Sequence, residues 1–118
     1  MSRARVLIVE DVDILAEMWC GQLEMEGIEP VWACSLQEGE EKFFANGQFD
    51  LIIMDSCVPG RVANSMDLVK TIKASGFDKP IVANSSLPDC LEAIYEAGAT
   101  HKAYKNDVIK VVLSLLGQ

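Results

Sequence analysis

The chain has 118 residues, of which half are apolar and 24% are charged, and its formal net charge is −8. This length allows one domain with a substantial buried core, and the composition is typical of a soluble globular protein. The negative charge argues against nucleic-acid binding through a general basic surface, because phosphate contacts need clustered lysine and arginine. It favours a bound cation or a partner with a basic face. We expect a single domain over residues 1–118, monomeric or weakly dimeric.

The cysteine content indicates a reducing compartment. Cys20, Cys34, Cys57 and Cys90 are scattered without a CxxC pair, and the single histidine, His101, completes no familiar zinc pattern with them. This usage is typical of reduced thiols in a cytoplasmic protein. The N-terminus does not have the pattern of a signal peptide, and no apolar stretch approaches the length of a membrane span. We therefore expect a cytoplasmic location and no membrane contact.

The first elements alternate between strand and helix patterns. The apolar run RVLIVE at 5–10 predicts a buried strand. Apolar residues at helical spacing predict a helix over 13–26, with a following glycine as its stop. A weaker strand is predicted at 28–34, and Pro30 indicates that this strand lies near a sheet edge.

The alternation continues to the end of the chain. Ser35 and Glu38 form a capping-box pattern, which predicts a helix that ends near Asn46-Gly47. Residues 51–54 are the most apolar strand, and a loop of about ten residues follows it. The remaining predicted elements, in order, are a helix from Ser65, as N-cap, to Gly76, a strand at 80–84, a helix from Pro88 to Ala97, a short strand at 101–104 and a helix at 107–116.

Five successive strand–helix units predict an α/β fold, a doubly wound five-stranded parallel sheet with helices on both faces. Five units suggest the flavodoxin-like strand order 2-1-3-4-5. In this order the first and third strands are neighbours, and ligands of such sheets bind at the carboxyl ends where the order reverses. The crevice between these two strand ends is the predicted site.

Acidic residues follow both of these strands. The first strand ends in Glu10-Asp11, and Asp55 follows the third. Three crowded carboxylates are costly without a counterion, and Mg²⁺ is a cation that carboxylates hold while leaving room for phosphate oxygens. A carboxylate can also act as a nucleophile and form an aspartyl phosphate. Taken singly, the acid pair could cap a helix and Asp55 could cap a turn, but two independent strand ends agree on a metal site.

Two further strand ends carry groups suited to phosphoryl transfer. The fourth strand leads to Ser85, which offers a hydroxyl, and the fifth leads to Lys105, whose ammonium could pair with Asp55 or with a phosphate on it. Phosphoryl transfer is catalysed mainly by positioning and charge stabilisation. Taken singly, such a serine is more often a helix cap, and such a lysine is more often a solvated surface group. Only the combination of the acids, the hydroxyl and the lysine at successive strand ends indicates phosphoryl transfer.

Four segments of the chain resemble the receiver domains of two-component response regulators, and the resemblance extends over nearly all residues. The matching motifs are VLIVEDVD, LIIMDSCVPG, PIVANSS and EAGATHKAYK. The resemblance implies that Asp55 is the phosphoacceptor. It also implies that Mg²⁺ is held by Glu10, Asp11 and Asp55, directly or through water, together with the backbone carbonyl of Cys57.

The same resemblance implies roles for the remaining site residues and for partners. Ser85 would bond a phosphoryl oxygen, and Lys105 would contact the acceptor carboxylate or the phosphoryl group. A histidine kinase or a histidine phosphotransfer protein of a phosphorelay would supply the phosphoryl group, and a downstream protein would receive the signal. The chain would be a signalling phosphoacceptor rather than an enzyme, either a stand-alone regulator or a receiver cut from a longer protein.

The sequence departs from the family around the pocket. Asn106 stands where a proline usually follows the lysine, and Lys102 stands at the position of the switch aromatic. Tyr104 is aromatic, but strand alternation places it on the opposite face from residue 103. The loop after Asp55 is about two residues longer than usual, and the stretch SSLPDCLEA is shorter. We interpret these changes as an unusual partner surface on a working phosphoacceptor.

Three alternative functions remain open. The first is a phosphorylation-independent, degenerate receiver-like module that binds proteins through the same fold. The second is an aspartyl-phosphate phosphatase or phosphotransferase, which is disfavoured because Cys57 stands where the second acid of an Asp-x-Asp pattern is needed. The third is a flavin or dinucleotide protein. The first turn, EDVD, disfavours it because it presents carboxylates instead of a glycine-rich phosphate cradle.

Overall fold

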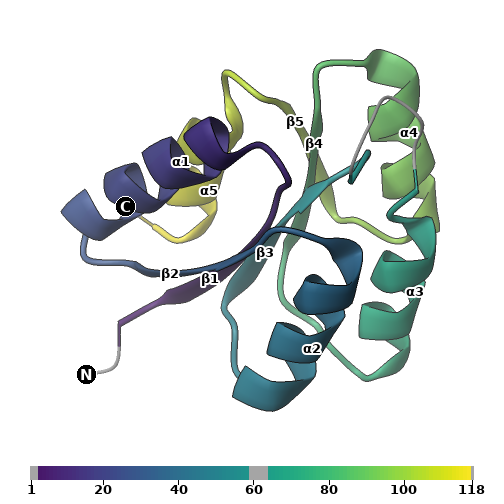
Figure 1. The fold of residues 1–118 in the computed structure, drawn as a ribbon, viewed down its shortest axis with the longest axis horizontal. Coiled ribbons are helices and arrows are strands. Elements are labelled where there is room, and N and C mark those ends of the chain that lie inside the picture. Colours follow the sequence, from purple (N-terminus) through teal and green to yellow (C-terminus); the bar gives the residue numbers. More distant parts are fainter. Residues whose placement is uncertain (1–2, 59–63, 118) are drawn as a thin grey trace.

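Five parallel strands form one sheet in the order β2-β1-β3-β4-β5, which confirms the predicted α/β fold (Figure 1). The computed structural model describes residues 3–58 and 64–117. The strands are β1 Arg5–Val9, β2 Glu29–Ala33, β3 Leu51–Asp55, β4 Ile81–Ser85 and β5 His101–Tyr104. The helices are α1 Asp13–Met25, α2 Leu36–Asn46, α3 Met66–Ala74, α4 Pro88–Ala97 and α5 Val108–Leu115. Within the described ranges, no helix has the length and hydropathy needed to cross a membrane.

The helices cover the two faces of the sheet unequally. Figure 1 shows α1 and α5 on one side of the sheet and α2, α3 and α4 on the other. All strands run toward the same edge, so the loops after their carboxyl ends gather at the top of this view. The chain turns from one face to the other where β1 and β3 lie side by side, which is where such folds bind ligands.

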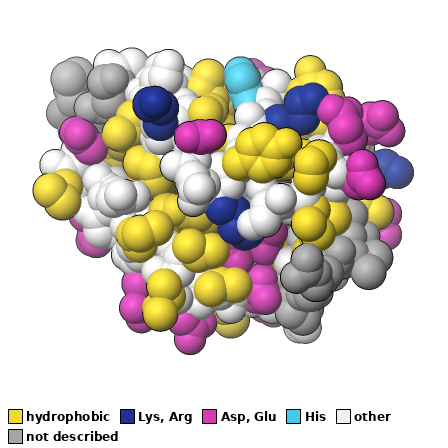
Figure 2. Space-filling model, turned by 90° about the horizontal axis from the view of Figure 1, so that it is seen from above, with side chains coloured by type: hydrophobic (Ala, Val, Ile, Leu, Met, Phe, Trp, Pro, Cys, Tyr) yellow, Lys and Arg dark blue, Asp and Glu magenta, His cyan; other side chains and the backbone are white. Residues whose placement is uncertain are grey.

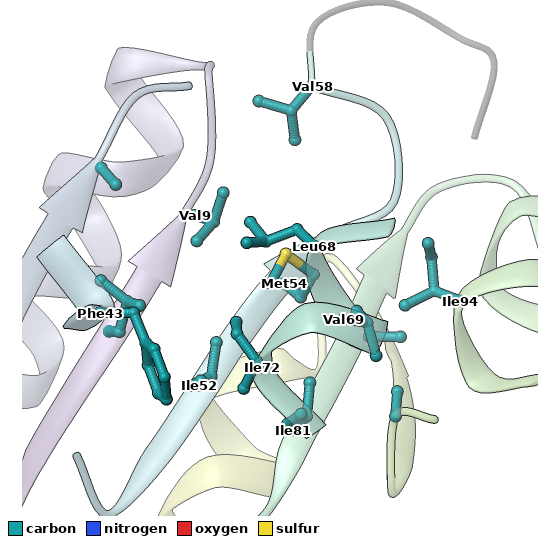
Figure 3. Close-up of a cluster of buried hydrophobic side chains, with 14 of the residues drawn as sticks. Val9, Phe43, Ile52, Met54, Val58, Leu68, Val69, Ile72, Ile81 and Ile94 are labelled. Atoms are coloured by element: carbon teal, nitrogen blue, oxygen red, sulfur yellow. The ribbon is translucent and has the colours of Figure 1, made fainter. Parts of the chain in front are cut away.

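Each buried strand contributes alternate side chains to two hydrophobic layers, because successive strand residues point to opposite faces. Leu7, Val9, Ile52 and Met54 pack toward α2, α3 and α4 (Figure 3). Their neighbours in the chain pack against α1 and α5 around the buried Trp19. Burial on both faces explains why these strands are continuous apolar runs in the sequence.

The predicted helix starts are confirmed at three positions, and at one of them the serine side chain bonds elsewhere. Ser35 Oγ accepts a hydrogen bond from the Glu38 N–H at 3.1 Å, while the Glu38 carboxylate accepts from the Cys34 N–H and not from Ser35. Helix α4 begins at Pro88, where the missing N–H costs nothing. Ser65 is the N-cap residue of α3, as predicted, but its hydroxyl makes no cap hydrogen bond. It donates instead to the Asp55 carbonyl at 2.5 Å.

Other boundaries agree to within one or two residues. Strand β2 is an edge strand and contains Pro30, as predicted. Strand β3 extends one residue further than predicted and includes Asp55 itself. The longer loop predicted after Asp55 contains residues 59–63, which lie outside the described residues.

The central strand should dominate the stability of the fold. Ile53 in β3 is fully buried, whereas Ile14 on α1 is 76% exposed. We expect Ile53→Ala to lower the free energy of unfolding by about 3 kcal/mol, because it removes buried methyl groups and leaves a cavity. The matched change Ile14→Ala should alter it by less than about 0.5 kcal/mol. Urea unfolding measures both, and equal effects would contradict this packing.

Candidate functional site

Three carboxylates from two neighbouring strands meet at the carboxyl edge of the sheet. Glu10 and Asp11 follow β1, and Asp55 is the last residue of β3, which pairs with β1 through Val9 and Met54. One carboxylate oxygen from each acid lies within 4.8 Å of the other two. Glu10 and Asp55 are buried. The sequence therefore correctly predicted that the two strand ends bring these acids together.

Lys105 lies between the two buried acids. Its Nζ is 2.6 Å from Glu10 Oε1 and 3.4 Å from Asp55 Oδ1. It also donates to Asn84 Oδ1 at 3.1 Å, and it lies 5.7 Å from the centre of the Trp19 ring. The sequence predicted a contact with Asp55, and the structure adds Glu10 as the closer partner. One ammonium group therefore serves two buried carboxylates.

The lysine reaches this position although no proline follows it. Asn106 lies in a turn that the Asp107 N–H closes by donating to the Tyr104 carbonyl at 2.9 Å. This turn connects β5 to α5 and directs Lys105 back over the strand ends. The absence of the proline has therefore not displaced the ammonium group from the acid cluster.

Burial beside a second acid raises the pKa of Asp55 to about 8. Burial is the largest cause, and the negative charge of Glu10 is the second. The nearby Lys105 ammonium and the Cys57 N–H, which lies 3.4 Å from Asp55 Oδ1, lower the pKa but do not compensate. These surroundings favour the protonated form of Asp55 in the metal-free protein, and a divalent cation would favour its ionised form.

The acids open into a cleft that contains most of the predicted site. A cavity of about 160 Å³ is lined in part by Asp11, Asp55, Cys57, Ser85 and Lys105. Figure 2 views the molecule from the end of the sheet where the strands finish, and basic and acidic atoms lie against one another near the middle of this face. The cleft is small and its lining supplies oxygen ligands, which fits a hard cation such as Mg²⁺ with its waters.

The Ser85 hydroxyl is oriented by the backbone. Ser85 Oγ accepts a hydrogen bond from the Leu87 N–H at 3.0 Å, so the hydroxyl proton can be donated to another oxygen in the cleft. Ser85 is the last residue of β4 and is buried, which places this donor at the rim beside Asp55.

The structure reveals supporting residues that the sequence did not indicate as functional. Asn84 pairs in register with Asp55, is fully buried and accepts from Lys105, while its Nδ2 has no hydrogen-bond partner among the described residues. The Trp32 indole N–H donates to the Glu10 carbonyl at 2.7 Å. Asn84 could have been found from the sequence, because it stands in an otherwise apolar strand and a buried amide needs a hydrogen-bond partner. Trp32 gave no comparable signal.

The position of the family's switch aromatic is occupied by a polar contact. Lys102 forms an ion pair with Glu92 of α4, and its ammonium lies 4.7 Å from the centre of the Tyr95 ring. Ala103 is buried and Tyr104 is exposed, which confirms that they face opposite ways. An aromatic side chain at position 104 therefore does not replace the missing one at position 102.

Charge neutralisation of Asp55 should stabilise the metal-free protein at high pH. Because the folded-state pKa is raised from 3.8 to about 8, the native state keeps a proton that the unfolded state loses, and the free energy of unfolding falls as pH rises through this window. We expect Asp55→Asn to remove this fall and to be more stable than wild type by up to about 5 kcal/mol at pH 8, with little difference at pH 4. Urea unfolding in a chelator measures it. The exposed change Asp78→Asn is the control, and an unchanged pH profile in Asp55→Asn would contradict the assignment.

Removal of the lysine should strengthen cation binding. Lys105→Met takes a positive charge away from two candidate ligands, so we expect Mg²⁺ affinity to rise about tenfold. The control Lys102→Met removes a lysine that pairs with α4 instead and should leave the affinity unchanged. Isothermal titration calorimetry measures both, after circular dichroism has shown that the variants are folded. Weaker Mg²⁺ binding by Lys105→Met would mean that the lysine does not compete with the cation.

Comparisons with known proteins identify the fold. No family model and no curated protein matches the sequence. A two-component response regulator from Clostridium difficile has 20% identity and a TM-score of 0.83, with 98% of each chain covered. The chemotaxis protein CheY4 of Vibrio cholerae has 24% identity and a TM-score of 0.80, again with 98% of each chain covered. TrrA of Thermotoga maritima, solved in complex with Mg²⁺ and BeF, has 24% identity and a TM-score of 0.80, covering 95% of this chain and 98% of that one. This chain therefore has the receiver fold of response regulators.

Proposed function

We propose that this chain is a phosphoacceptor receiver of a two-component or phosphorelay system. Asp55 would accept the phosphoryl group from a phosphohistidine of a kinase or phosphotransfer protein. Glu10, Asp11, Asp55 and the Cys57 backbone carbonyl would hold Mg²⁺. The observation that carries this proposal is the approach of three carboxylates to within 4.8 Å beside a lysine. The Mg²⁺ and BeF complex of the structurally similar TrrA supports it.

The residues of the cleft supply what the transfer requires. An Asp55 oxygen forms the new P–O bond while the P–N bond of the phosphohistidine breaks, so Asp55 must be ionised. Bound Mg²⁺ would neutralise the acids and the charge on the transferred phosphoryl oxygens. Ser85 can donate its hydroxyl proton to one of these oxygens, and Lys105, now paired with Glu10 and Asp55, can contact another.

The phosphorylated site would control binding of a downstream protein. A phosphoryl group changes the charge at the loops around the cleft, and such a local change can shift a two-state element. Lys102 of β5 and Glu92 of α4 form an ion pair at the surface. Such an exposed pair contributes little to the stability of the fold. We infer that the chain acts as a signalling module without a separate enzymatic substrate.

One observation favours a second candidate, a module that binds proteins without phosphorylation. The 2.6 Å pair of Lys105 with Glu10 supplies the acid cluster with a built-in cation. If this pair persisted in the presence of Mg²⁺, the pocket would be structural. Binding of beryllofluoride with Mg²⁺ separates the two functions, because the degenerate module would not bind it at Asp55.

Phosphorylation by a small donor tests the proposed function directly. After incubation with acetyl phosphate and Mg²⁺, we expect mass spectrometry to locate one phosphoryl group on Asp55. Asp55→Asn should abolish the label, and a chelator should reduce it strongly. The exposed Asp89→Asn near the same edge is the matched control and should be labelled like wild type. Undiminished labelling of Asp55→Asn would exclude Asp55 as the acceptor.

A further inference from the structure

Two buried cysteines from distant parts of the chain touch beside the candidate metal site. Cys57 follows β3, and Cys90 lies in the first turn of α4. Their sulfur atoms are 3.3 Å apart and both side chains are buried. The other two cysteines, Cys20 and Cys34, are more accessible and are found on α1 and after β2. The contact between Cys57 and Cys90 therefore arises from the way the fold brings the end of β3 and the start of α4 together.

The geometry of this pair is close to that of a cystine. A disulfide needs sulfur atoms about 2.05 Å apart, so the two at 3.3 Å must approach by about 1.2 Å. Cys57 follows β3 outside any helix or strand, and Cys90 lies in the first turn of α4. Two reduced cysteines could also be ordinary core packing. The cleft distinguishes this pair, because Cys57 is one of its lining residues.

We propose that Cys57 and Cys90 are a redox-sensitive pair that forms an intramolecular disulfide when the protein meets a peroxide. The bond would tie the loop after β3 to α4 next to Asp55. It joins residues that are 33 positions apart and that the fold already holds in contact.

The reaction is balanced by one peroxide molecule. The Cys57 sulfur attacks a peroxide oxygen, the O–O bond breaks, and a sulfenic acid and one water form. The Cys90 sulfur then attacks the sulfur of this sulfenic acid, the S–O bond breaks, and a second water leaves with the remaining thiol proton. Two thiols thus lose two electrons and two protons, and hydrogen peroxide is reduced to two waters. Burial and the contact with Cys90 raise the pKa of Cys57 to about 12. Because the thiolate is the reactive form, the first step is slow, and the experiment measures the final yield of disulfide instead of the initial rate.

The cross-link would act on the metal site, a consequence that rests on the proposed function. The Cys57 carbonyl is a proposed Mg²⁺ ligand, and Mg²⁺ requires near-ideal octahedral geometry. Drawing the Cys57 side chain toward α4 shifts this part of the backbone and restrains the loop. We expect the oxidised protein to bind Mg²⁺ about tenfold more weakly than the reduced protein, which is the size of effect that displaced supporting groups have on metal sites.

Peptide mapping after oxidation tests the disulfide without any substitution. The reduced protein is treated with hydrogen peroxide, remaining thiols are alkylated, and tryptic peptides are analysed without reductant. Lys70 and Lys73 separate the two cysteines, so a bond between them joins two peptides. We expect a Cys57–Cys90 peptide pair that a thiol reductant releases. Recovery of both cysteines in other forms, or bonds to Cys20 or Cys34 instead, would overturn the proposal.

Two variants separate the cross-link from its effect on the site. A protein carrying Cys20→Ser and Cys34→Ser retains the pair and should form the same disulfide, whereas Cys90→Ala should not. Calorimetry then compares Mg²⁺ affinity before and after peroxide treatment, and only the first variant should lose affinity. An unchanged affinity in the cross-linked protein would overturn the coupling. Failure of the reduced protein to bind Mg²⁺ and beryllofluoride would count against the proposed function and leave the mapping result valid.

Discussion

The site depends on two buried carboxylates that share one ammonium group. Glu10 and Asp55 lie below the surface, and Lys105 reaches both. Burial makes ionisation of both acids costly, and a single lysine cannot neutralise the pair. The metal-free site is therefore short of positive charge, and burial together with the charge of Glu10 raises the pKa of Asp55. This shortage is what a divalent cation or a basic partner group can relieve.

The register of the sheet produces this arrangement. Strand β1 pairs with β3, and β3 with β4, so that Asp55 lies beside Asn84 and one residue beyond the pair of Val9 and Met54. A one-residue slip would turn every side chain of a strand to the other face. The apolar layers on both sides of the sheet prevent such a slip, because it would exchange the sets that pack against α1 and α5 and against the other helices. Core packing thus also positions the site.

Sequence patterns predicted the elements and the meeting of the acids, because both follow from local periodicity and the topology of parallel sheets. They did not predict the closer partner of Lys105, which is Glu10, or the donation from Ser65 to the Asp55 carbonyl. These contacts depend on side-chain rotamers and on distances between residues far apart in the chain. Serine before a helix is usually a cap, and here a carbonyl at the end of β3 accepts its hydroxyl proton instead.

Two contacts connect α4 to the rest of the fold near the acid pocket, and neither of them involves an aromatic side chain at position 102. The exposed Lys102 pairs with α4 at the surface, and solvent weakens such a pair. The contact of Cys57 with Cys90 is buried, and it links the backbone beside Asp55 to the first turn of the same helix. Because both of these side chains are buried, solvent does not weaken their contact. The pair that we propose to be redox-sensitive is therefore also a buried contact between the segment beside Asp55 and α4.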